Sequence, residues 1–177
     1  TAWTRTLGTP APAYAQVQGN IFEVSGANNA QATWTSQIIN IAAYTAGVNL
    51  SVNLAEAPGN GFETLEATDS IFVYYRLNGG PLTPFPVNGA IADDFTAALA
   101  TTGVLIGSTV QIIGRVHYST TSPGAELYRF DNVIVSANDF LPNSNPTFNL
   151  FPPLFLCVGS SFNFDHSATD INGDSLV

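Results

Sequence analysis

The sequence predicts an all-β fold, an antiparallel β-sandwich, and three observations lead to that class. Residues 48–54 alternate strictly between apolar and polar side chains, which is typical of a strand with one buried face and one wet face. Similar runs follow one another along the chain, separated by turns rich in Gly, Pro and Asn. No segment shows the apolar spacing of an amphipathic helix. The apolar parity of residues 48–54 consists of Val48, Leu50, Val52 and Leu54.

The strands before residue 48 are expected to follow an irregular start. Pro10 and Pro12 would interrupt a ladder, so residues 1–12 are expected to be irregular. Residues 14–24 and 33–41 are runs rich in Ile, Val and aromatic side chains, and each is predicted to form a strand.

Residues 69–80 are the stretch around which the other strands are expected to pack. Both parities of residues 71–77 carry bulky side chains, which predicts a central strand covered on both faces. Asn78-Gly79 predicts a type I′ turn, because both residues readily adopt positive φ. A Pro-rich loop is expected over residues 81–88, and residues 90–100 are expected to hold the one helical turn.

Two further strands complete the predicted sandwich. Residues 110–118 alternate again, and Gly114 is expected to mark a β-bulge within them. The inward set there is Val110, Ile112, Val116 and Tyr118, and the outward set is Gln111, Arg115 and His117. In residues 126–135 the two opposed sets are Leu127, Val133 and Val135 against Tyr128, Phe130 and Ile134.

The composition changes after this last strand, which predicts a domain boundary. Residues 1–137 are expected to form the sandwich, and residues 138–151 have the Pro, Asn and Ser content of a linker. Residues 152–177 are predicted to be the truncated opening of a second β domain, because two short strands cannot build a core alone. The alternative is that this tail packs on the first domain as an extra edge strand.

Charge and composition exclude several classes of protein. The chain has four arginines, no lysine and 13 acidic side chains, for a net charge of −9. Such a chain repels phosphate backbones, and nucleic acid is therefore excluded as a partner. No apolar run approaches the roughly 18 residues of a membrane-spanning helix. A lysine-poor surface rich in Asn, Thr and Ser is common in secreted and cell-surface modules, so a secreted protein is expected.

An acidic segment near the end of the chain has the oxygen donors that Ca²⁺ prefers. Asp170, Asn172 and Asp174 lie at alternate positions around Gly173, and Asp165 is close enough in sequence to add a ligand. The pattern is not an EF-hand, because no bidentate glutamate follows it. A hairpin built on Asn172-Gly173 is an equally good interpretation of the same residues.

A second group of polar residues surrounds the strand at 71–77 and the strand at 126–135. Glu63, Glu66 and Asp69 precede the first, while Asp131 and Asn132 lie within the second. Such groups could bind a structural Ca²⁺ or a sugar, but solvated loop charges are the favoured interpretation.

Exposed aromatic rings are a better indication of a ligand than these carboxylates. Trp3, Trp34, Tyr74 and Tyr75 could stack on sugar rings, although Trp34 and one of the tyrosines are expected to fill the core.

The chain shows no arrangement typical of an enzyme. A glycosidase needs two opposed carboxyl groups about 5–10 Å apart, and the sequence has no Glu-x-Asp-x-x-Glu segment that would supply them on one strand. Neither histidine belongs to a nucleophilic arrangement, and no Gly-x-Ser-x-Gly occurs. A non-catalytic protein is therefore predicted.

The tail carries a resemblance to a known class of protein. Residues 152–159 read Pro-Pro-Leu-Phe-Leu-Cys-Val-Gly, and residues 168–176 read Ala-Thr-Asp-Ile-Asn-Gly-Asp-Ser-Leu. This tail resembles the repeat opening of giant surface proteins of Bacteroidota, the SprB-type gliding-motility adhesins exported by type IX secretion. The resemblance implies an Ig/cadherin- or PKD-like second domain and makes Ca²⁺ a cofactor at the acidic segment. It also implies that Cys157 pairs with a cysteine beyond Val177.

The first domain resembles the lectin-like jelly-roll modules found in such proteins. The segments that carry this likeness are Tyr-Tyr-Arg-Leu-Asn-Gly-Gly at 74–80 and Tyr-Arg-Phe-Asp-Asn-Val at 128–133. Together the two likenesses imply a module of a cell-surface adhesin that attaches to surfaces or polysaccharide during gliding. Its partners would be an extracellular polysaccharide and the secretion and surface-anchoring machinery. The alternatives are a polysaccharide-active enzyme of the sandwich type and a structural spacer.

Overall fold

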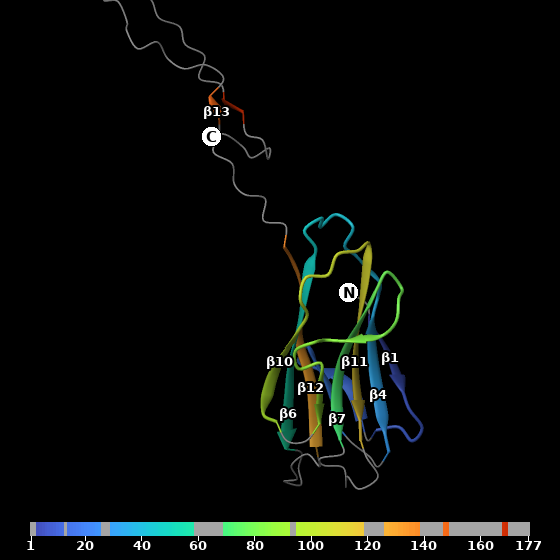
Figure 1. Ribbon diagram of the computed structural model, residues 1–177. Helices are drawn as coiled ribbons and strands as arrows, with labels where there is room; N and C mark the ends of the chain where they lie inside the picture. Colours follow the sequence, from blue (N-terminus) through green and yellow to red (C-terminus); the bar gives the residue numbers. More distant parts are fainter. Residues whose placement is uncertain are drawn as a thin grey trace, which may run out of the picture. The chain divides into compact units, whose positions relative to one another are not determined.

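Two antiparallel sheets stack face to face in the first part of the chain (Figure 1). Sheet A has the order β1-β4-β11-β7-β8, with β5 beside β11 and β9 beside β7. Its strands are β1 (Trp3–Leu7), β4 (Gln31–Ser36), β5 (Ile39–Asn40), β7 (Ser70–Leu77), β8 (Thr83–Pro84), β9 (Ala90–Ala92) and β11 (Thr109–His117). Sheet B has the order β10-β6-β12-β3-β2. Its strands are β2 (Tyr14–Gln18), β3 (Ile21–Ser25), β6 (Val48–Pro58), β10 (Ala97–Thr101) and β12 (Glu126–Ala137).

The computed structural model describes residues 3–12, 14–25, 29–58, 69–92, 95–118, 126–138, 147–148 and 168–169. None of these residues is helical, and so this part of the chain has no helix able to cross a membrane. The predicted all-β antiparallel sandwich is confirmed.

The chain divides into two units, Thr1–Asp139 and Phe140–Val177. In the second unit the structure describes one short antiparallel pair, β13 (Thr147–Phe148) with β14 (Ala168–Thr169). The predicted linker at 138–151 and the Ig/cadherin-like opening at 152–177 otherwise lie outside the described residues, so both stay predictions.

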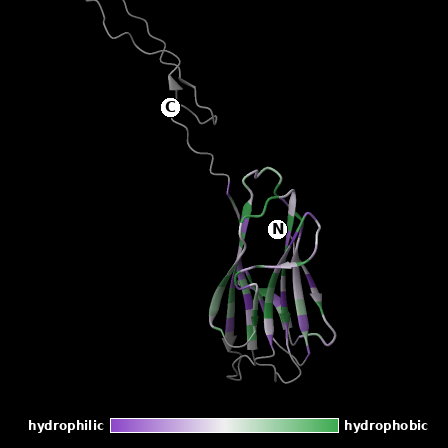
Figure 2. Cartoon of the chain, in the orientation of Figure 1, coloured by the Kyte–Doolittle hydropathy of each residue, from purple (hydrophilic) through white to green (hydrophobic). Residues whose placement is uncertain are grey.

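The core lies between the two sheets and follows the alternation of the sequence. In β6 the side chains of Val48, Leu50, Val52 and Leu54 are at most 1% exposed. The inward set predicted for β11 is buried as well, while Gln111, Arg115 and His117 lie on the other face. Hydrophobic and hydrophilic positions accordingly alternate along the strands in Figure 2.

Aromatic side chains join the two layers. Trp34 from sheet A is 3% exposed and lies between Phe22 and Phe130 of sheet B, with ring centroids 5.4 and 6.0 Å away. The hydroxyl of Tyr118, which follows β11, donates a hydrogen bond of 3.0 Å to the carbonyl oxygen of Val24 in β3. The prediction that Trp34 fills the core is confirmed, and this aromatic layer fastens sheet A to sheet B.

Gly114 does not mark a bulge, contrary to prediction. It pairs in unbroken register with Trp34 of β4 and Val73 of β7. A Cβ atom at this position would lie 3.0 Å from the Phe130 ring. Glycine avoids this close contact, because the ring of sheet B packs directly on the backbone of β11.

The bulge lies instead in β12 and reverses the faces of that strand. Asp131 pairs with Asn53 but Ile134 pairs with Ser51, so β12 has one more residue than β6 in this interval. Asn132 adopts a φ of 46°, a conformation that Asn tolerates better than most residues. The predicted grouping in β12 is wrong for this reason: Tyr128 and Phe130 face inward before the bulge, and Val133 and Val135 pack on the core after it.

The strand predicted to be central has one buried face. β11 occupies the centre of sheet A, and β7 lies between it and the short strands β8 and β9. Ile71 and Val73 of β7 are fully buried, whereas Phe72 and Tyr74 are half-buried on the outer face. A two-layer sandwich covers only one face of each sheet. The prediction that the strand is covered on both faces, made from bulky side chains on both parities, is therefore wrong.

The turn after β7 has the predicted conformation. Asn78 and Gly79 have φ values of 52° and 69°, and the amide of Gly80 donates to the carbonyl oxygen of Leu77 at 2.9 Å. The side-chain oxygen of Asn78 also accepts hydrogen bonds from the amides of Ser108 and Thr109 at the start of β11.

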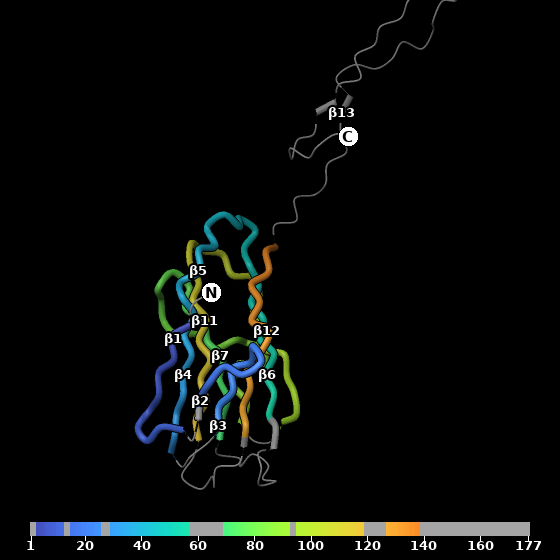
Figure 3. The backbone as a smooth tube through the Cα atoms, turned by 180° about the vertical axis from the view of Figure 1, so that it is seen from behind, coloured from blue at the N-terminus to red at the C-terminus, as the bar shows by residue number. Residues whose placement is uncertain are grey.

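Three other segments differ from their predictions. Residues 1–12 are not wholly irregular, because β1 pairs with β4 before the first proline is reached. Residues 14–24 form the hairpin β2–β3, whose turn uses positive φ at Gly19 and Asn20 (Figure 3). Residues 90–100 contain no helical turn in their described part. They supply β9 to sheet A and β10 to sheet B, since each strand has a partner that satisfies its backbone.

Candidate functional site

The outer face of sheet B is hollowed into a groove of about 520 Å³. This volume is within the range of pockets that bind small molecules, about 300–1,000 Å³. The residues that line it come from four strands, and they are Ile21, Asn53, Leu54, Ala55, Ala97, Ala98, Leu99, Arg129 and Asp131.

The hollow follows from the register of the strands. Ala97 of β10 is opposite Ala55 of β6, and Ala55 is opposite Arg129 of β12. In the next outward row, Asn53 lies between Leu99 and Asp131. The two alanines leave space beside longer side chains, so the groove has an alanine floor and a polar wall formed by β12. We call this the groove face.

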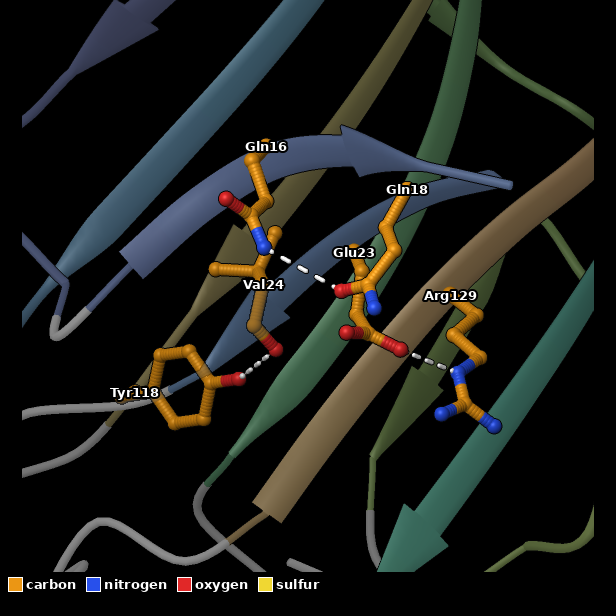
Figure 4. Close-up of polar contacts among 6 residues, drawn as sticks. All are labelled: Gln16, Gln18, Glu23, Val24, Tyr118 and Arg129. Carbon is orange, nitrogen blue, oxygen red and sulfur yellow. Dashed lines mark hydrogen bonds and ion pairs between the residues drawn. The ribbon is translucent and has the colours of Figure 1, made fainter. Parts of the chain in front are cut away.

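Arg129 is held in place by a buried carboxylate (Figure 4). Its Nε donates to Glu23 Oε2 at 2.6 Å, and the side chain of Glu23 is 10% exposed. Gln16 donates to Gln18 beside this pair, at 3.2 Å. Arginine has five N–H donors, and the terminal nitrogens of Arg129 make no hydrogen bond within the described part of the chain. These donors remain available to a ligand.

The groove face combines donors and acceptors at short range. Arg129 supplies N–H donors, Asp131 supplies carboxylate acceptors, and the amide of Asn53 supplies both. Asp131 and Asn53 are paired residues in adjacent strands, and Arg129 precedes Asp131 by two residues on the same face. The arrangement suits a ligand whose own groups both donate and accept, such as a row of hydroxyls.

The outer face of sheet A is different, and we call it the arginine–aromatic face. It carries Phe72, Tyr74 and Arg76 from β7, and Arg115 and His117 from β11. The rings of Phe72 and Tyr74 are 5.8 Å apart and inclined by 20°. The guanidinium carbon of Arg115 lies 5.4 Å from the centre of the Tyr74 ring, a cation–π geometry.

The residues predicted to bind Ca²⁺ are not tested by the structure. Asp165, Asp170, Asn172 and Asp174 lie outside the described residues, as do Glu63, Glu66 and Cys157. Within the described ranges, no three His, Cys, Asp or Glu side chains form a group that could hold a metal ion.

Two carboxylates named from the sequence have opposite positions. Asp69 is fully buried at the start of β7, so its interpretation as a solvated loop charge is wrong. Asp131 lines the groove face instead. Asp69 shares the inward parity of Ile71 and Val73, whereas Asp131 lies on the outward parity of β12.

Three of the four aromatic candidates belong to the interior. Trp34 is buried, and Trp3 and Tyr75 are partly buried side chains packed against the core. Tyr74 alone of the four lies on an outer face. The prediction that Trp34 and one tyrosine fill the core is confirmed, with Tyr75 as that tyrosine.

Sequence reasoning missed the polar wall of the groove. Arg129 and Asp131 occupy alternate positions in one strand, which places them on a common face. Asn53 is on the wet parity of β6. The sequence shows these parities, but the alignment of the three residues depends on the pairing of β6 with β12. In that pairing Asn53 lies opposite Asp131, which follows it by 78 residues.

Comparison with known proteins gives limited similarity. No family model and no curated protein matches the sequence. A solved structure of TmCBM61 in complex with beta-1,4-galactotriose is 10% identical, with 76% of this chain and 88% of that chain covered and a TM-score of 0.47. A CBM4 structure is 18% identical, with 76% and 86% covered and a TM-score of 0.44. Similarity at this level assigns no ligand and no activity.

Proposed function

We propose that the chain is a non-catalytic carbohydrate-binding module that holds a polysaccharide in the groove face. The observation that carries this proposal is the polar wall of the groove: Arg129, oriented by Glu23, beside Asp131 and Asn53. Neighbouring sugar hydroxyls each donate one hydrogen bond and accept others. Asp131 would accept from such a pair while the free nitrogens of Arg129 donate to it.

Preorganisation supports this use of Arg129. A free arginine loses rotamer entropy when it is immobilised by a ligand, at about 0.5–1.5 kcal/mol for each side chain ordered. Glu23 already holds the guanidinium in the folded chain, with Arg129 Nε 2.6 Å from Glu23 Oε2. Most of the rotamer entropy of Arg129 is therefore lost on folding, and ligand binding loses little more. Leu99, which is half-exposed, and Ile21 would contact the C–H surfaces of the sugar rings.

The carboxylates of the groove do not favour catalysis. Glycoside hydrolysis needs two carboxyl groups that face the bond to be broken. Among the described residues that line the groove, Asp131 is the one carboxylate, and the nearby Glu23 is engaged by Arg129. We therefore propose binding without turnover.

A glycan array followed by calorimetric titration with a retained oligosaccharide tests the proposal. Asp131→Ala and Asn53→Ala should each weaken binding about five- to hundredfold, the loss of hydrogen bonds worth roughly 1–3 kcal/mol. Thr35→Ala, on the outer face of sheet A, is the matched control and should bind normally. Absence of binding to any glycan would contradict the proposal, and the release of reducing ends from a β-glucan panel would favour the enzyme instead.

We further propose that the module belongs to a secreted surface adhesin of the gliding-motility type. The resemblance of residues 152–177 and the lysine-free, acidic composition support this context. Detection of the protein on intact cells with an antibody, and reduced attachment after deletion of residues 1–137, would be the expected results. Attachment unchanged by that deletion would leave a spacer role.

Calcium at Asp165, Asp170, Asn172 and Asp174 is part of the same proposal. Binding of Ca²⁺ to a folded state alone raises the apparent stability of that state. The melting temperature of the full chain should therefore rise with Ca²⁺ and fall on chelation, and replacement of Asp170 and Asp174 by Asn should remove the effect. A melting curve indifferent to Ca²⁺ would contradict this site.

A further inference from the structure

The arginine–aromatic face concentrates positive charge on an acidic protein. The whole chain carries −9, yet two of its four arginines, Arg76 and Arg115, lie on this one face together with His117. The outward positions of the described strands of sheet A include no Asp or Glu. At physiological ionic strength the Debye length is about 8 Å, so a ligand on this face is shielded from most of the distant acidic groups.

The same face carries two aromatic rings beside the charges. Ile113 of β11 is directly opposite Tyr74, and Phe72 lies next to Tyr74 on the same side of β7. Ile113 is only 4% exposed although it is on the outward parity, which shows that neighbouring side chains pack closely over it. The inclined pair Phe72 and Tyr74 is half-buried, and ring faces attract the positive edges of C–H groups.

Arg115 is positioned to bind an anion next to those rings. It lies opposite Phe72 in one neighbouring strand and opposite Thr33 in the other. Its guanidinium rests over Tyr74, and its Nε is buried without a hydrogen-bond partner in the part of the chain that the structure describes. The two terminal nitrogens of Arg115 are therefore the donors that a ligand would reach. A planar guanidinium with free donors binds carboxylates in a bidentate manner. Thr33 adds a hydroxyl on the adjoining strand.

We propose that this face is a second binding site, independent of the groove face, for an anionic polysaccharide whose sugar units carry carboxylates. Phe72 and Tyr74 would contact the C–H groups of one sugar with the parts of their rings that remain exposed, and Arg115 would hold a carboxylate, with Arg76 further along β7. A neutral glycan would leave the arginines unused. A second copy of this chain is disfavoured as the occupant, because self-association of the face would bring like charges together.

Polygalacturonate and its methyl ester form a matched pair of probes, since esterification removes the charge and keeps the backbone. Affinity gel electrophoresis and calorimetric titration of the full chain, with chelator present to remove Ca²⁺, should show binding to polygalacturonate that weakens as salt is raised. Arg115→Gln and Tyr74→Ala should each weaken it about tenfold or more, the loss expected of a charge-assisted hydrogen bond or a stacking partner. Arg115→Lys, which keeps the charge but not the planar fork, should recover part of the affinity.

Val104→Ala, at an exposed loop position that belongs to neither face, is the control and should bind polygalacturonate as the unchanged chain does. Equal binding to the methyl ester, no binding to polygalacturonate, or binding indifferent to Arg115→Gln would each overturn the proposal. Sedimentation of the same variants tests whether a second copy of the chain occupies the face. A dimer that is lost in Arg115→Gln would assign the face to that second copy and would also overturn the proposal. Unchanged melting curves establish that each variant is folded.

Discussion

The two outer faces of the sandwich are built by the same alternation of side chains but have opposite character. On sheet B the outward residues Ala55 and Ala97 leave a hollow beside Arg129. On sheet A the outward residues Phe72 and Tyr74 fill the surface, and Arg115 lies over a ring. Outward positions, which contribute little to the core, therefore determine whether a sheet presents a groove or a platform.

The arginines of the two faces also differ in what holds them. Arg129 is anchored by a carboxylate with a side chain only 10% exposed, so its geometry is part of the folded structure. Arg115 rests on the Tyr74 ring, a weaker interaction worth about 0.5–1 kcal/mol at an exposed site. Five substitutions test how the two faces differ and whether they act independently.

Filling the hollow should have the largest effect. Ala97→Trp places an indole over the alanine floor, and it should weaken glycan binding to the groove face by about 3 kcal/mol, the upper end of overpacking costs. Because Ala97 is exposed, stability should change by no more than about 0.5 kcal/mol. Titration with the groove ligand and with polygalacturonate measures the affinity of each face separately. Equal losses for the two ligands would mean that the faces are not separate sites.

Replacing each arginine in turn should show that the ion pair of Arg129 stabilises the fold more than the cation–π contact of Arg115 does. Arg129→Gln removes the ion pair with Glu23 and should lower the free energy of unfolding by about 2–3 kcal/mol, less than for a fully buried pair because Arg129 is 35% exposed. Arg115→Gln should cost under about 1 kcal/mol. Urea denaturation of both variants provides the measurement. Similar costs for the two would remove the contrast between the faces.

A change inside the core should alter stability and neither face. Gly114→Ala introduces a Cβ 3.0 Å from the Phe130 ring and should cost about 1–2 kcal/mol as the ring shifts. Affinities measured well below the melting temperature should match those of the unchanged chain. Gly103→Ala, where a Cβ meets no neighbour, is a suitable control for the loss of a glycine. A change in binding at one face only would show that the core transmits strain to it.

The smallest expected effect concerns the connection between the sheets. Tyr118→Phe removes the hydroxyl that donates to Val24 and should lower the free energy of unfolding by about 1 kcal/mol. Thermal melts monitored by tyrosine and tryptophan fluorescence should still show one transition for the sandwich. Two separate transitions would indicate that this hydrogen bond is needed for the sheets to unfold together.

The fold could be predicted from the sequence wherever a strand has one wet face. The alternation of residues 48–54 and 110–118 and the type I′ turn at Asn78 are local signals, and the structure confirms them. The bulge at Asn132 and the glycine at 114 could not be predicted, because both depend on a ring or a partner strand distant in sequence. The helical turn predicted at 90–100 is wrong because alanine favours helices locally, whereas the strands that pair with this segment, β6 and β7, are distant in sequence.

The candidate sites were less accessible to prediction than the fold. Tyr74 was named from its ring, but its partner Arg115 was known only as an outward residue of another strand. The groove depends on small side chains, and alanines carry no chemical signal that draws attention to a binding surface. The residues of a site on a sheet are collected across strands, and so the site cannot be recognised before the pairing is known.

The back-to-back stacking of the sheets would make a connector of the two proposed sites. Polymers bound on opposite sides of the sandwich would not compete for space, so one domain would join a glycan in the groove to an acidic glycan on the other face. A mixture of the two polymers should then thicken when the protein is added, whereas either polymer alone should not.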